Sequence, residues 1–188
     1  MSDYSSNYEY KFYDWKYLDE ASLRALEDSH SDVEVKSILQ SKLHLHTYEE
    51  DPMQFDIISE FYFHLYVFCR ENAFSLRKTS SLISIVYEVF NRDAASIAWS
   101  NTHEESFAFF NNLLVKHCVD WSPKFIKVFT EGDARLIHTF VLELYYQNFR
   151  LYKYIFAKHL RMKITTKDPQ GVESPRNSTT SLQDSIPI

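Results

Sequence analysis

Glycine is scarce in this sequence, with only Gly132 and Gly171 among 188 residues. A phosphate-binding loop of the GxxxxGK[ST] type and a GxGxxG dinucleotide motif each need several glycines, because their backbones turn tightly and approach the ligand closely. We therefore exclude both nucleotide-binding classes. Hairpins built on Asn-Gly or Asp-Gly turns are also missing. Together with few prolines and a helical spacing of apolar residues, this predicts an all-α fold, a compact bundle of about five to six helices.

Cysteine is also scarce, and the 20 Lys and Arg residues are outnumbered by 26 Asp and Glu residues. With a formal net charge of -6, the chain lacks the basic surface typical of nucleic-acid-binding proteins, so we expect no nucleic-acid partner. Its two cysteines, Cys69 and Cys118, lie inside apolar stretches, which favours free thiols in a reducing compartment. No apolar run is long enough to span a bilayer, and the N-terminus does not resemble a signal peptide. We expect no membrane partner and an intracellular, cytoplasmic location.

Motifs for catalysis and metal binding are absent from the sequence as well. It contains no GxSxG, HExxH or paired CxxC motif and no kinase motif set. His44 and His46 form an H-x-H pair without a cysteine or carboxylate cluster at ligand spacing, so we expect no zinc site. An EF-hand loop needs a glycine at its sixth position, and Gly132 lacks the acidic flanks. The sequence predicts a protein that is not an enzyme and has no cofactor, with calcium at a loose carboxylate site left open.

Apolar periodicity predicts where the helices lie. We expect two short helices between Asp19 and Leu45, followed by helices over residues 53–72, 76–90, 102–118 and 130–160. Ser31 with Glu34 and Thr102 with Glu105 each match a capping box, in which two side chains satisfy free backbone N–H groups reciprocally. Further signals for helix starts are Pro52, Ser75 and Thr130.

Composition divides the chain into three parts. Residues 1–18 form an aromatic-rich N-terminal arm. We interpret it either as a disordered arm of which a few residues fold back on the domain, or as an arm that packs its rings onto a partner. Residues 19–164 form the helical domain. Residues 165–188 form a tail rich in Ser, Thr and Pro, which we predict to be disordered because it buries too little apolar area to offset the entropy of ordering.

The segment 130–160 has the clearest helical pattern of the chain. One apolar stripe predicts the face that packs on the core: Ile137, Phe140, Val141, Leu144, Tyr152, Ile155 and Phe156. Aromatic and basic residues beyond this stripe are our candidates for partner binding: Tyr145, Tyr146, Phe149, Arg150, Lys153, Lys158, Arg161 and Lys163. The basic members have two interpretations. They form either a solvated face favoured by the helix dipole or a contact for an acidic surface of a partner.

Two stretches of the sequence, residues 60–90 and 121–160, resemble a known family. The first contains FCR at a turn and KTS at a helix start, and the second contains an aromatic segment running into Thr130. A final helix with the pattern from Tyr146 to Phe156 completes the order. In these parts and this order the chain resembles the CLAMP-domain family, and the resemblance spans roughly residues 20 to 162.

This family includes a small subunit of a projection on one central-pair microtubule of motile cilia and flagella. The resemblance implies a structural protein of the ciliary or sperm-flagellar axoneme that docks on central-pair or microtubule-associated proteins, with tubulin and microtubules as further candidate partners. One small member of the family is described as a ciliary-associated calcium-binding coiled-coil protein, and this chain resembles it in size. The alternative implied function is therefore a calcium-responsive ciliary regulator that binds calcium without an EF-hand.

Overall fold

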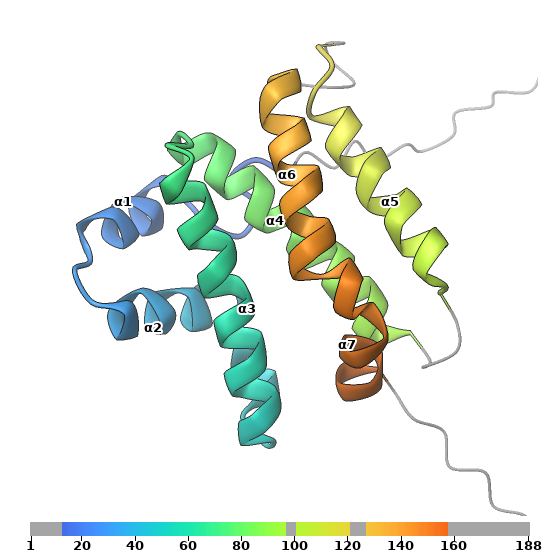
Figure 1. Ribbon diagram of the computed structural model, residues 1–188. Helices are drawn as coiled ribbons and strands as arrows, with labels where there is room; N and C mark the ends of the chain where they lie inside the picture. The colour runs from blue at the N-terminus through green and yellow to red at the C-terminus, as the bar shows by residue number, and fades with distance from the viewer. Residues whose placement is uncertain (1–12, 97–100, 121–126, 158–188) are drawn as a thin grey trace, which may run out of the picture.

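Helices form all the regular secondary structure in the described part of the computed structural model, which covers residues 13–96, 101–120 and 127–157 (Figure 1). The all-α prediction is confirmed. The predicted disordered tails lie outside these ranges, apart from the last residues of the N-terminal arm. The α-helices are α1 (Glu20–Asp28), α2 (Asp32–Lys42), α3 (Pro52–Glu71), α4 (Leu76–Ala95), α5 (His103–Lys116), α6 (Glu131–Leu144) and α7 (Phe149–Phe156). Two 3₁₀ turns, η1 (Leu45–Tyr48) and η2 (Tyr146–Asn148), precede α3 and α7.

Most helix starts follow the local sequence signals. At α5, Thr102 and Glu105 form both hydrogen bonds of a capping box, as predicted. Thr130 caps α6, and Asp133 returns the second bond. The predicted capping box at Ser31 is wrong, because Ser31 stands at the N-cap of α2 but its side chain makes no capping hydrogen bond. That helix start is exposed, so water can satisfy its free N–H groups.

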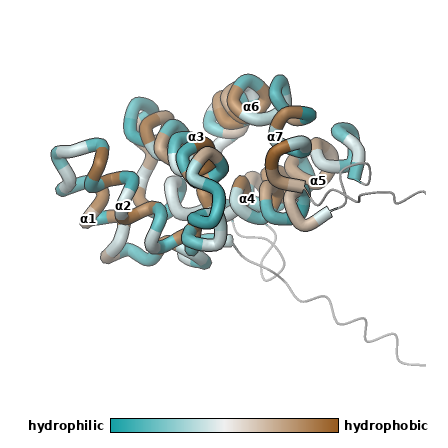
Figure 2. The backbone as a smooth tube through the Cα atoms, turned by 90° about the horizontal axis from the view of Figure 1, so that it is seen from below, coloured by the Kyte–Doolittle hydropathy of each residue, from teal (hydrophilic) through white to brown (hydrophobic). Residues whose placement is uncertain are grey.

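The central helix of the molecule is α4, which packs against α1, α3, α5 and α7. In Figure 2, α1 and α2 lie at one end of the molecule and α5 lies toward the other, with α3 and α4 between them. Small buried residues such as Ser80, Ser81 and Ser84 on α4 allow its neighbours to approach closely. The helix ends at Ala95, five residues after the predicted end at Phe90. These added residues include Asp93, which is buried.

Aromatic rings fill the interior between α3, α4 and α7. The ring centroid of Phe61 lies 5.7 Å from Phe90 and 5.8 Å from Tyr145. Phe90 in turn meets Phe156 edge to face at 5.0 Å. Such pairs contribute about 0.5–1.5 kcal/mol each beyond the burial of their area. The predicted core stripe of residues 130–160 joins this interior: Ile137 and Val141 are buried, and Phe140, Leu144, Tyr152 and Phe156 are partly buried against it.

The chain does not form one continuous helix over residues 130–160, and that prediction is wrong. The helix α6 ends at Leu144, and α7 begins at Phe149 after the η2 turn. No proline or glycine lies at the break. Tyr145 and Tyr146, which lie at the break, are both buried. The turn lets Tyr145 reach the aromatic interior while Tyr146 packs 5.1 Å from Phe107 of α5.

Residues 13–18 lie folded back on the helical domain. Tyr13 and Leu18 are buried. The Ser80 hydroxyl accepts a hydrogen bond from the N–H of Trp15 and donates one to the carbonyl of Leu18. This part of the N-terminal arm therefore belongs to the packed structure and is in contact with α4.

A buried histidine joins this N-terminal segment to the end of α5. The Nε2 atom of His117 accepts a hydrogen bond from the N–H of Tyr13 at 3.4 Å, and its Nδ1–H donates to the carbonyl of Leu113 at 2.8 Å. Its own carbonyl accepts from the N–H groups of Val128 and Phe129, just before α6. His117 therefore connects three segments of the chain, and these bonds require its neutral ring.

Candidate partner-binding site

A buried carboxylate organises the opposite end of α5. Asp93 at the end of α4 is 2% exposed. Its Oδ2 atom accepts hydrogen bonds from the Ser106 hydroxyl at 2.6 Å and the Tyr145 hydroxyl at 2.8 Å. Its Oδ1 atom accepts from the side-chain amide of Asn101. The carboxylate thereby links the ends of three helices, and its lone pairs are well supplied with donors.

Two further side chains extend this cluster. The Tyr146 hydroxyl lies 3.1 Å from that of Ser106. The amine of Lys153 donates to the Ser96 hydroxyl at 2.5 Å and to the backbone carbonyl of Asp93 at 3.5 Å. We call the whole cluster the Asp93 network: Asp93, Ser96, Asn101, Ser106, Tyr145, Tyr146 and Lys153. It ties α7 to the end of α4 and the start of α5.

Burial dominates the electrostatics of this network. It raises the pKa of Asp93, while hydrogen bonds from Ser106 and Tyr145 and the charge of Lys153 act in the opposite direction. Burial also lowers the pKa of Lys153, although the Asp93 carboxylate opposes this. The pKa of Tyr145 is raised well above its usual value by burial, with the Asp93 charge adding to the effect. Tyr145 therefore stays protonated at neutral pH and serves as a hydrogen-bond donor.

One gap beside Asp93 is closed by aromatic side chains. Phe90, Tyr152 and Phe156 close it, and the gap between them has no volume accessible to a solvent molecule. Elsewhere among residues 13–96, 101–120 and 127–157, no group of three or more His, Cys, Asp and Glu side chains gathers in a way that could hold a metal ion. The arrangement is suited to holding helix ends together.

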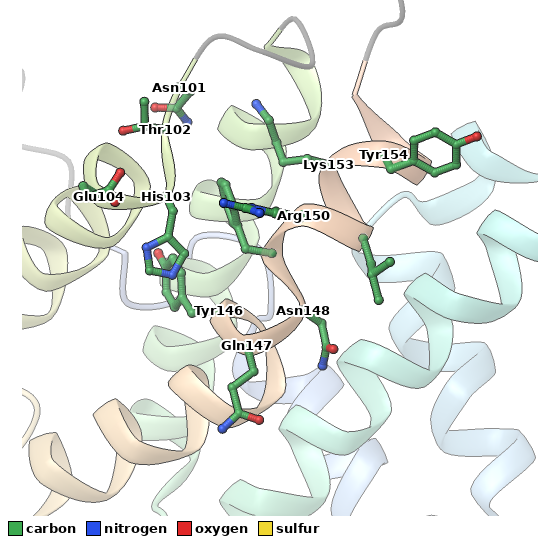
Figure 3. A pocket seen from close by; sticks show the side chains of 12 residues that line it. Asn101, Thr102, His103, Glu104, Tyr146, Gln147, Asn148, Arg150, Lys153 and Tyr154 are labelled. Atoms are coloured by element: carbon green, nitrogen blue, oxygen red, sulfur yellow. The ribbon is translucent and has the colours of Figure 1, made fainter.

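A groove of about 790 Å³ lies beside the network, between the start of α5 and the η2–α7 segment (Figure 3). We call it the α5–α7 groove. Its lining residues are Asn101, Thr102, His103, Glu104, Tyr146, Gln147, Asn148, Phe149, Arg150, Leu151, Lys153 and Tyr154. The ring of His103 meets Tyr146 at 5.3 Å and Phe149 at 5.5 Å. These three rings give the groove an aromatic floor.

The structure divides the predicted partner-binding residues into three groups. Tyr145, Tyr146, Phe149 and Lys153, which we selected as side chains beyond the core stripe, are buried, and their role in partner binding stays a prediction. The break after Leu144 turns them inward. Arg150 is exposed and lines the groove. The other three, Lys158, Arg161 and Lys163, lie outside the described residues.

Sequence reasoning missed the residues that pair with these side chains. Asp93 and Asn101 fell in a predicted link between helices, and Ser106 and His103 were assigned to a helix start without a further role. One local signal was available. The capping box at Thr102 places His103 and Ser106 on the first turn of a helix. Their partners on η2 and α7 are distant in sequence, so no local pattern reveals them.

Comparison with known families identifies the family of this chain. A family model described as CLAMP, flagellar C1a complex subunit C1a-32, matches residues 64–164, which is more than half of the chain. The chain belongs to this family. The predicted resemblance to this family and the location in the flagellar axoneme that it implies are confirmed, although residues 20–63 of the predicted span lie outside the match.

The family match covers the parts of the structure described above. It begins within α3 and includes all of α4, α5, α6 and α7. The Asp93 network, the α5–α7 groove and His117 all lie inside it, whereas α1 and α2 precede it. Among the described residues, no helix combines the length and the hydropathy of a bilayer-spanning segment.

Proposed function

We propose that this chain is a structural component of motile cilia or sperm flagella that docks on axonemal proteins and catalyses no reaction. The observation that carries this proposal is membership of a family described as a subunit of the flagellar C1a complex. A subunit of a complex acts by binding its neighbours. The central-pair apparatus is the compartment that the family description favours.

The interior of the described structure supports a structural role. Its buried carboxylate, Asp93, has a raised pKa, accepts hydrogen bonds from three side chains and borders a gap between aromatic rings that holds no solvent volume. Perturbed pKa values mark catalytic sites when they occur in an open cleft, and they mark structural networks when they occur in a filled core. The Asp93 network belongs to the second kind. Its function in this proposal is to fix the position of α7 and so the shape of the α5–α7 groove.

Localisation and extraction test this proposal. A tagged chain expressed in multiciliated cells should lie along motile axonemes and should stay with them after the membrane is removed with detergent. A uniform cytosolic signal that detergent washes out would refute the proposal. Co-sedimentation with bare microtubules then separates two classes of partner, because a chain that docks only on other axonemal proteins stays in the supernatant.

Calcium-responsive regulation in the same organelle is the alternative that the family resemblance raises. Calorimetric titration of the full chain with calcium distinguishes the two functions. Micromolar binding that is removed by substitution of identifiable carboxylates would favour the regulator. Heat changes no larger than those of dilution would favour a purely structural component.

A further inference from the structure

The α5–α7 groove has an excess of positive charge on an acidic protein. Its lining contains two cationic side chains, Arg150 and Lys153, and one carboxylate, Glu104. The N-terminal end of α5 also opens onto it, and helix N-termini favour negative charge. The whole chain has a net charge of -6. A chain of this net charge repels acidic segments overall, whereas the charges of this groove attract them.

The two cations have different roles. Lys153 is 7% exposed, and its amine is held by Ser96 and the carbonyl of Asp93. Arg150 is exposed and forms no ion pair with any residue of the described ranges. Figure 3 shows its side chain extending from α7 toward His103 on α5. Arg150 is therefore the cation whose guanidinium is placed to bind a carboxylate with two parallel hydrogen bonds.

Apolar surface adjoins this guanidinium. Leu151 follows it directly on α7 and is 61% exposed, and Tyr154, one turn further along, is 72% exposed. Single exposed apolar side chains are common on protein surfaces. Here they flank a groove that already has an aromatic floor, and arginine beside tyrosine is a frequent composition of interface hot spots. The occupant that fits this surface combines carboxylates with at least one apolar side chain.

We propose that the α5–α7 groove binds an acidic peptide segment of a partner protein. In this arrangement Arg150 binds a carboxylate of the segment, and Leu151 contacts an apolar side chain next to it. The inference rests on the proposed function, because it gives the chemistry of one partner on which the chain docks. Lys153, Tyr146 and Phe149 hold the groove in shape from below.

Fluorescence anisotropy with a labelled synthetic probe tests this inference. The probe is a short Glu-rich peptide that contains leucine, and its comparison peptide has Gln in place of every Glu. The full chain should bind the Glu-rich peptide and bind the Gln peptide at least about tenfold more weakly, since a charge-assisted contact is lost. Equal binding of both peptides, or binding of neither, would overturn the inference.

Matched variants then locate the binding. Arg150→Glu should weaken binding of the Glu-rich peptide by at least about tenfold, and Leu151→Ser should weaken it less. Arg24→Glu makes the same charge change on α1, where Arg24 is also exposed and pairs with Glu20, and it should leave binding nearly unchanged. Equal losses for Arg150→Glu and Arg24→Glu would mean non-specific attraction and would overturn the groove assignment. Thermal melts of each variant exclude unfolding as the cause.

The failure of this inference and the failure of the proposed function give different results. A tagged Arg150→Glu chain that loses peptide binding but still localises to extracted axonemes at the wild-type level would show that other surfaces carry the docking. A wild-type chain that never associates with axonemes would refute the proposed function, whatever the peptide measurements show.

Discussion

The start of α5 is joined to the rest of the molecule through a buried, charged carboxylate, whereas its end is joined through a buried, neutral histidine ring. At its start, the charged carboxylate of Asp93 gathers donors from Asn101, Ser106 and Tyr145. At its end, the neutral ring of His117 accepts from Tyr13 and donates to Leu113. A buried charge costs free energy unless every neighbour satisfies it, whereas a neutral ring needs only two partners. We therefore expect a substitution of Asp93 to lower the free energy of unfolding more than a substitution of His117 does.

The largest expected effect comes from removing the charge at the first end. Asp93→Ala leaves the donors of Asn101, Ser106 and Tyr145 without an acceptor, so the free energy of unfolding should fall by about 3 kcal/mol or more. Urea denaturation measures this loss. Asp56→Ala on the exposed side of α3 is the control and should stay within about 0.5 kcal/mol of the wild type. A loss of stability at Asp93 no larger than that at Asp56 would show that the buried carboxylate contributes no more than an exposed one, and the proposed difference between the two ends of α5 would be wrong.

A smaller effect is expected at the second end. His117→Phe keeps a ring of similar size but removes both nitrogen atoms, so it should cost about 1–2 kcal/mol through two lost hydrogen bonds. Hydrogen exchange should also speed up at the N–H of Tyr13, which loses its acceptor, while α7 stays protected. Exchange that rises equally in α7 would show that the two ends are coupled and not independent.

Two buried tyrosines test how much a hydrogen bond to Asp93 contributes to stability, because one of them donates such a bond and the other does not. Tyr145→Phe removes one donor from Asp93 and should cost about 1 kcal/mol. The hydroxyl of Tyr62 is also buried but has no hydrogen-bond partner among the described residues, so Tyr62→Phe should be neutral or slightly stabilising. Thermal melts of the two variants provide the test. Equal destabilisation by both would mean that the hydroxyl of Tyr145 contributes by packing alone.

Local features of the fold could be predicted from the sequence, and features set by distant residues could not. The caps at Thr102 and Thr130 were predicted because each depends on residues within one turn. The break after Leu144 was not, because the sequence there contains no proline or glycine that would signal it. A core stripe predicts which side of a helix is apolar, but it cannot show where the helix stops.

The candidate site was the harder part to predict. Arg150 was selected for its charge, and it is exposed in the groove as a partner-binding residue must be. Its buried neighbour Lys153 has the same charge and nearly the same sequence context, yet it has a structural role. The partners that separate the two are Ser96 and Asp93, which lie more than 50 residues earlier in the chain. Asp93 itself is a single carboxylate in a polar stretch and carries no signal of its own.

The smallest expected effect is a difference in pH dependence between the two ends. Burial lowers the pKa of His117, and the charges of Lys116 and Arg77 add to this, while the bond to Leu113 and the charge of Asp14 oppose it. The unfolded state therefore binds the proton more readily, and the stability that His117 contributes is lost as the pH falls through its unfolded value of about 6.5. Burial raises the pKa of Asp93, so its contribution has the opposite sign and is lost as the pH rises above about 3.9 through the raised folded value.

Each dependence can be isolated by subtraction. The free energy of unfolding of the wild type minus that of His117→Phe should decrease as the pH is lowered from neutral to mildly acidic. The wild type minus Asp93→Asn should instead increase as the pH is lowered through the acidic range, because the buried carboxylate gains its proton in the folded state first. Two slopes of the same sign would show that one of the buried groups is solvated in the folded protein. The opposite electrostatic character assigned to the two ends of α5 would then be wrong.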